Sequence, residues 1–223
     1  MLYIDFISSL NDEDRENYNK FSKIRGTQQY KIIYETLLKI DSNITYKDVN
    51  SFIRYDKALK DVLFKYLGTL EEYIKNDILL NFDFSSDAII KKEDYHFFDK
   101  LPKCIEKSQP KYEITEFYKR FALNFRDIVS FVREYCPNKF DVNKLDDIVY
   151  LRNAVMHHSP LLFSYNFEST KDITMIRIKK LIELLPLDYP KYIISEINER
   201  TEKTTNNINN SFICLLLDIL KEV

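Results

Sequence analysis

Arg152, Asn153, His157 and His158 lie in one short stretch and carry side chains suited to chemistry on a phosphate. Histidine titrates near neutral pH, so an imidazole can accept the proton of a ribose 2′-hydroxyl or protonate the departing 5′ oxygen. The guanidinium of Arg152 can hold the phosphate and its transition-state charge, and Asn153 can orient the His157 ring. These residue types predict metal-independent RNA cleavage to a 2′,3′-cyclic phosphate, which spares DNA because DNA lacks the 2′-hydroxyl.

The spacing of these residues fits the end of a helix, which Pro160 stops soon after His158. On a helix Asn153 and His157 share a face, whereas Arg152 and His157 lie roughly 140° apart and about 7.5 Å along the axis. A second copy across a two-fold axis would bring two arginines and two histidines into one cleft, which favours a homodimer. The structural alternative, histidines that only interact with the helix dipole, remains open on spacing alone.

The composition predicts an all-α protein. The chain has only two glycines and six prolines, too few turn residues for a hairpin-rich β fold and too few glycines for a phosphate-binding loop. We expect a single helical domain over residues 1–223, a helical bundle with additional flanking helices. Its core lies at about 27–185, and C-terminal helices at 187–223 close the bundle or contribute to a dimer.

Apolar spacing and capping residues indicate where the helices lie. The predicted helices cover residues 3–25, a segment opened by Thr27, 45–52, 54–82, 87–98, 115–135, a segment from Asp141 or Asn143 to about His158, 169–185, 188–201 and 211–223. Gly68 falls in the middle of the longest helix, which a close helix crossing would explain. Glu71 and Lys75 are one turn apart and can pair.

The charge and the cysteines limit the partners. A formal net charge of −2 excludes a generally basic surface, so RNA would need a local patch, for which Lys103, Lys107 and Lys111 are candidates. Three widely spaced cysteines without a CxxC pair argue against zinc and disulfides. No metal or other cofactor is expected. The absence of a basic leader and of a long apolar run predicts a cytoplasmic protein with no membrane contact.

Three motifs resemble those of one family. Arg152-Asn153-x-x-x-His157 resembles the R-N-x-x-x-H signature of the HEPN superfamily. The histidine doublet His157-His158 at the end of this motif resembles that of the Abi-like branch, the abortive-infection proteins of the AbiD and AbiF type. Upstream, residues 55–60 resemble that branch's F-D-x-x-L-R, and residues 70–75 resemble its I-E-x-x-L-R. The likeness spans about residues 30 to 165. It departs from the family where lysines replace both upstream arginines, which removes bidentate pairing there.

The resemblance implies a helical bundle, often dimeric, that acts as a metal-independent ribonuclease in toxin–antitoxin, abortive-infection or other antiphage defence. Arg152 and His157 would be catalytic, Asn153 supporting and His158 a second candidate. Glu71 would be either an acidic residue directed at the active site or part of a structural salt bridge with a neighbouring helix. A protein or small-RNA antitoxin is a possible partner besides the RNA substrate.

Two other functions remain open. One is a catalytically silent HEPN module that binds RNA or a partner protein, which the near-neutral surface and the replaced arginines favour. The other is a structural adaptor that dimerises through a terminal helix at 211–223.

Overall fold

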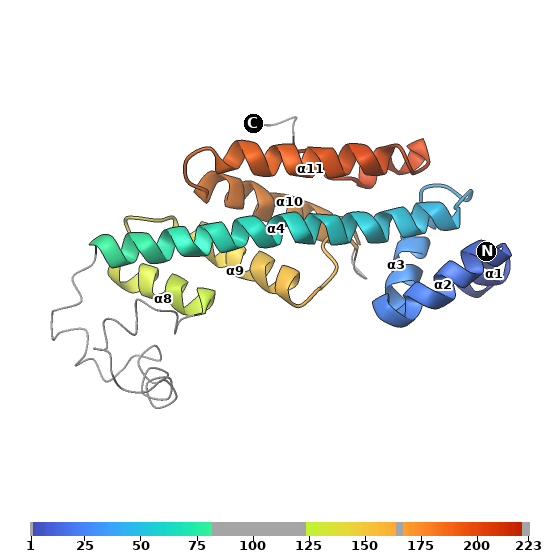
Figure 1. Ribbon diagram of the computed structural model, residues 1–223, viewed down its shortest axis with the longest axis horizontal. Coiled ribbons are helices and arrows are strands. Elements are labelled where there is room, and N and C mark those ends of the chain that lie inside the picture. The colour runs from blue at the N-terminus through green and yellow to red at the C-terminus, as the bar shows by residue number, and fades with distance from the viewer. Residues whose placement is uncertain (1, 82–123, 164–166, 220–223) are drawn as a thin grey trace, which may run out of the picture. The chain divides into compact units, whose positions relative to one another are not determined.

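The computed structural model describes residues 2–81, 124–163 and 167–219, and all regular elements within those ranges are helical (Figure 1). They are α1 (Tyr3–Ser8), α2 (Asp12–Arg25), α3 (Thr27–Leu38), α4 (Tyr46–Asn81), α8 (Phe125–Tyr135), α9 (Val142–Met156), α10 (Phe167–Leu184), α11 (Tyr189–Thr205) and the 3-10 helix η1 (Asn210–Leu215). The predicted all-α fold is confirmed. The predicted helix at 87–98 and the first part of that at 115–135 lie outside the described residues.

The contacts divide the chain into two compact units. The first consists of residues 1–66 and 151–223, and the second of residues 67–150. Two helices contribute to both, because α4 begins in the first unit and α9 ends there. The whole RNxxxH stretch belongs to the first unit.

Polar side chains begin several helices as their types predict. The side chain of Asn11 accepts the Asp14 amide at 2.8 Å at the start of α2, and Asn124 caps α8 in the same way. Asp141 accepts the Lys144 amide at 3.1 Å, so it opens the helix that carries the candidate site. Each cap satisfies an amide that has no partner inside its helix.

The predicted boundaries are wrong at three places. The helix expected over 3–25 is interrupted between α1 and α2. Thr27 is the first residue of α3 and makes no side-chain cap; Gly26, with φ of 81°, holds the cap position. The segments 45–52 and 54–82 form one helix, α4, because no glycine or proline separates them.

The core of the first unit is largely aromatic. Its largest fully buried side chains are Tyr30, Tyr34, Tyr55, Tyr66, Phe52, Phe163, Phe212, Ile33, Leu37 and Leu59. Phe52 and Phe163 meet edge to face with ring centroids 5.2 Å apart, a favoured aromatic geometry. The Tyr55 hydroxyl lies 2.7 Å from the Thr201 hydroxyl and accepts the Leu217 amide at 3.3 Å. Burial raises the pKa of Tyr55 to about 12, so the phenol stays protonated and α4 stays joined to α11.

The C-terminal segment is not the predicted helix. After η1 the chain is irregular through residue 219, and the buried side chains include the consecutive Leu215, Leu216 and Leu217. An α-helix on a surface would turn one of three consecutive residues toward solvent. Burying all three requires the irregular path that is observed. The segment therefore completes the core of the first unit.

In the second unit, one ion pair joins α8 to α9 and another joins the turn between them to α4. Arg133 on α8 contacts both carboxylate oxygens of Asp146 on α9 at 2.5 and 2.6 Å, and Lys139 lies 2.6 Å from Asp77 on α4. A Cβ added to Gly68 would meet nothing within 4 Å, so the expected close crossing there is wrong. None of the helices described combines the length and apolar character that a bilayer-spanning segment needs.

Candidate functional site

The helix α9 ends in a Schellman motif built around the two histidines. The Ser159 amide donates to the Ala154 carbonyl at 2.9 Å, and the His158 amide donates to Val155 at 3.2 Å. His158 takes the left-handed conformation that this motif requires, with φ of 54°. A residue other than glycine in that conformation costs about 1 kcal/mol or more, and histidine is among the residues that tolerate it better. The predicted helix end is thus observed.

The four residues of the motif differ in exposure. Arg152 and Asn153 are half-buried, and the Nε atom of Arg152 is buried. His157 and His158 are exposed. The His157 amide donates to the Asn153 carbonyl at 2.9 Å, which stacks these residues one turn apart on the face predicted for both. The imidazoles are therefore accessible, while the arginine stem is anchored in the protein.

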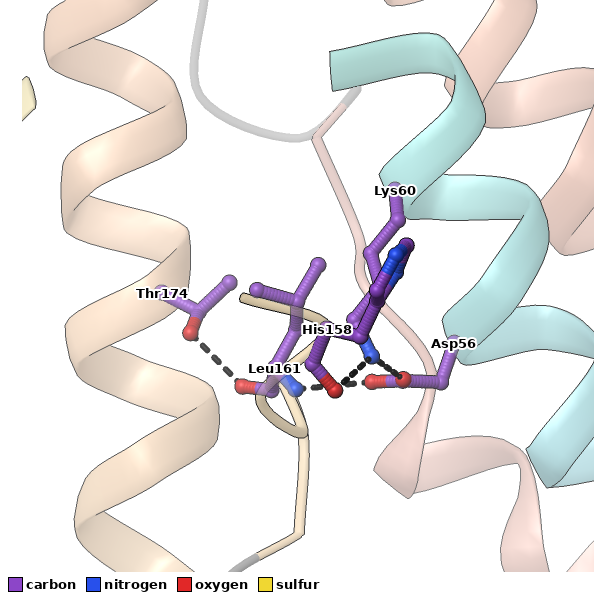
Figure 2. Close-up of polar contacts among 5 residues, drawn as sticks. All are labelled: Asp56, Lys60, His158, Leu161 and Thr174. Atoms are coloured by element: carbon purple, nitrogen blue, oxygen red, sulfur yellow. Dashed lines mark hydrogen bonds and ion pairs between the residues drawn. The ribbon is translucent and has the colours of Figure 1, made fainter. Parts of the chain in front are cut away.

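A buried ion pair on α4 holds the chain just after the histidines (Figure 2). Asp56 and Lys60, one helical turn apart, are 1% and 8% exposed and form a short ion pair. Lys60 also donates to the His158 carbonyl at 3.2 Å. The second oxygen of Asp56 accepts the Leu161 amide at 2.7 Å. The pair thus fixes the backbone on both sides of Pro160.

The opposite side of this loop is held by α10. The Thr174 hydroxyl donates to the Leu161 carbonyl at 2.6 Å, and Thr174 is itself buried. Leu161 therefore has its amide bound by α4 and its carbonyl bound by α10, as Figure 2 shows. A loop held at two backbone groups by buried partners has little freedom, and it positions His158 at the end of α9.

A pocket of about 340 Å³ opens beside this helix end. Val155 of α9 and His158, just beyond the end of α9, line it together with Lys57, Lys60 and other residues of α4. Two exposed apolar side chains at its margin, Phe64 at 56% and Ile24 at 77% exposure, also line it. The volume lies near the lower end of the range for ligand pockets, about 300–1,000 Å³. The lining combines apolar surface, an imidazole, two lysines and two aspartates, Asp56 and Asp61.

The upstream motif at residues 55–60 acquires a structural role. Sequence reasoning matched this motif but assigned no function to Asp56 or Lys60. One feature of the sequence could have indicated this role. Asp56 and Lys60 lie four residues apart on the apolar stripe of a long helix, where a charge without a partner is unfavourable. The second motif supplies Glu71, which lies in the second unit and pairs with Lys75 at 2.8 Å, the one-turn pairing on α4 that the sequence predicted.

The sequence also raised a basic loop of three lysines, the cysteines and the question of a metal site. Lys103, Lys107 and Lys111 lie outside the described residues, so the proposed basic loop stays a prediction. Cys136 and Cys214 form no disulfide. Among the residues with described positions, no three histidine, cysteine or acidic side chains gather into a group that could hold a metal ion.

Comparisons with protein-family models, with curated proteins and with solved structures found no match to this chain.

Proposed function

We propose that this chain is a metal-independent endoribonuclease of bacterial antiphage defence, of the abortive-infection or toxin–antitoxin type and related to the HEPN superfamily. The observation that carries the proposal is the rigid end of α9, where two exposed imidazoles follow an anchored arginine beside a pocket. A backbone held by buried partners is the kind of support that catalytic groups need.

The proposed roles follow from the chemistry of each side chain. His157 accepts the proton of the attacking 2′-hydroxyl or donates a proton to the departing 5′ oxygen. Arg152 holds the phosphate and the negative charge that grows on it as the 2′ oxygen attacks. Asn153, one turn from His157, orients the imidazole or donates to the phosphate. His158 is the second imidazole available for the other proton transfer.

The test is RNA cleavage in EDTA by purified wild type and variants. We expect wild-type cleavage to survive chelation and to leave 2′,3′-cyclic phosphate ends. His157→Ala should lower the rate at least about 100-fold, the usual contribution of a general acid or base. Arg152→Ala should lower it by about the same factor, because it removes a transition-state contact.

Two further variants control this experiment. His158→Gly suits the left-handed backbone at that position, so it keeps the helix end while removing the second imidazole. Lys191→Ala changes an exposed residue of α11 and should cut RNA as the wild type does. Cleavage that requires added metal, or that is equal in His157→Ala and wild type, would rule out the proposed chemistry.

The catalytically silent module is the second candidate. The burial of Asp56 and Lys60 favours it in one respect, because that motif serves the architecture and would be retained without catalysis. If Arg152→Ala and His157→Ala leave RNA binding and toxicity on induction unchanged, the binding module is the better description. The adaptor hypothesis loses its basis, because residues 211–219 form no α-helix and complete the core.

A further inference from the structure

A second pocket, of about 280 Å³, lies between α4 and α11 and is strongly basic. Four cationic side chains line it: Lys47 and Arg54 from α4, and Arg200 and Lys203 from α11. None of the described residues that line it is acidic. In a chain with a formal net charge of −2, such a concentration of positive charge marks a site for an anion.

Most of this charge is not compensated by neighbouring groups. Lys47 and Arg54 are exposed and make no ion pair within the described part of the chain. Arg200 and Lys203 both lie beside the carboxylate of Glu199, which is 3.8 Å from Arg200 and accepts a short hydrogen bond from Lys203. A second carboxylate, Glu196, also interacts electrostatically with Arg200, but it is bonded to Lys65 at 2.6 Å. The hydrogen bond from Lys203 and the charges of both cations lower the pKa of Glu199. Because Lys65 offsets Glu196, the four cations and Glu199 together leave three positive charges at the pocket.

The helices that carry these cations are held together by buried contacts. The Tyr55 hydroxyl, bonded to Thr201 of α11 and to the Leu217 amide, joins the two walls of the pocket. Thr204 is buried and donates to the Arg200 carbonyl at 2.9 Å within α11. The cationic side chains therefore project from a fixed frame.

The lining selects phosphate over a nucleobase. Tyr55 is the one aromatic residue among those lining the pocket, and at 1% exposure its ring offers no face on which a base could stack. Guanidinium and ammonium groups are the usual partners of phosphate. Lys47 and Arg54 are separated by two helical turns, about 10 Å. This separation suits neighbouring phosphates of one strand better than a single phosphate.

We propose that this basic pocket binds the sugar–phosphate backbone of single-stranded RNA and holds the strand that the end of α9 acts on. The inference rests on the proposed function. Arg54 in this pocket and Lys57 in the pocket beside His158 are three residues apart and hence neighbours on α4. A strand that crosses α4 over these two cations passes from the basic pocket to the pocket that His158 lines. Contact through phosphate alone makes binding independent of base sequence.

The test measures binding of a short fluorescent 2′-O-methyl RNA, which lacks the attacking hydroxyl and cannot be cut. Anisotropy titrations between about 50 and 200 mM salt give the slope of log K against log salt. The Lys47→Ala/Arg54→Ala protein should bind at least about tenfold more weakly at about 50 mM salt, because it loses two phosphate contacts. Its slope should be smaller by about 1.4, because each single-strand phosphate contact contributes about 0.7.

The matched control is Lys39→Ala/Lys191→Ala, which removes two exposed lysines outside the pocket and changes the net charge equally. It should keep the wild-type slope. A DNA probe of the same length should respond to Lys47→Ala/Arg54→Ala as the RNA probe does.

Equal slopes for the two double variants would overturn the assignment. A second result would also overturn it. If inorganic triphosphate displaces the probe at a concentration far below that needed for an RNA of equal charge, the pocket is selective for a free polyphosphate. The probe is not cut, so its binding is independent of nuclease activity. If the wild type cuts no RNA but Lys47→Ala/Arg54→Ala still shows the expected smaller slope, the proposed function is refuted and the assignment of the basic pocket to RNA binding stands.

Discussion

Asp56 determines the position of the candidate site without being part of its proposed chemistry. Its two oxygens bind Lys60 and the Leu161 amide, and Lys60 in turn binds the His158 carbonyl. A buried ion pair of this kind contributes little net stability compared with apolar side chains of the same size, but removal of one partner leaves a buried charge. The pair is therefore best understood as a means of fixing one loop geometry.

Asp56→Ala should reduce the free energy of unfolding by about 3–5 kcal/mol, because it leaves Lys60 and the Leu161 amide without their partner. Urea denaturation followed by circular dichroism measures this loss. Lys60→Met in the same background should recover much of it, because the unpaired buried charge is gone. A loss below about 1 kcal/mol for Asp56→Ala would show that the pair does not hold the loop.

For individual residues, the sequence predicted the end of the helix that carries the histidines. It did not predict the contacts from Asp56 and Lys60 that hold this helix end. The RNxxxH spacing and Pro160 were sufficient to place His157 and Asn153 on one face near the end of a helix. The groups that Lys60 and Asp56 bind lie 98 and 105 residues away along the chain. No local pattern reports a contact across that separation. The basic pocket was missed for the same reason, since its cations come from helices that are distant in sequence.

Among the elements, the C-terminal segment departs most from expectation. Its apolar residues look like one face of a helix, yet the burial of consecutive leucines overrides that pattern. Side chains near the segment explain the start of η1. Asn209 caps it through the Ser211 amide, and its own amide donates to the buried Asp48 at 2.9 Å. Hydrogen bonds to Asp48 and the fit to the core decide the path of the chain, and local helix propensity does not.

A chain truncated before Ser211 should fail to fold. It loses five buried apolar side chains, Phe212, Leu215, Leu216, Leu217 and Ile219, each worth about 1.5–3 kcal/mol. Their sum is comparable to the total stability of a domain, about 5–15 kcal/mol. Thermal melts monitored by circular dichroism test this expectation, and a folded, monomeric truncated protein would contradict it.

Neighbouring residues provide a finer version of that test. Phe212 is fully buried and Ile213 is 39% exposed. Phe212→Ala should therefore lower the free energy of unfolding by about 3–5 kcal/mol. Ile213→Ala should have an effect below about 1 kcal/mol. Equal effects would mean that the segment does not pack as described.

At the scale of the whole molecule, the proposed function predicts an active site shared by two chains. Arg152 and His157 lie on different sides of one helix, so the proposed dimer would pair the arginine of one protomer with the histidine of its partner. Mixing inactive Arg152→Ala with inactive His157→Ala should then restore about a quarter of wild-type cleavage, because half of the randomly mixed dimers have one intact site.

The mixing experiment needs exchange of protomers, which a brief incubation at elevated temperature provides. Each variant mixed with itself is the control. No recovery, with mixed dimers detected by differently tagged chains, would place both groups of a site in a single protomer.

The first unit draws its core from both ends of the described chain, residues 2–66 and 151–219. During translation, α4 with Asp56 and Lys60 leaves the ribosome long before the leucines that close the core around Tyr55. A nascent chain therefore cannot complete the fold that supports the histidines. The proposed nuclease would therefore be inactive until its translation ends, so a nascent chain could not cut the message that encodes it.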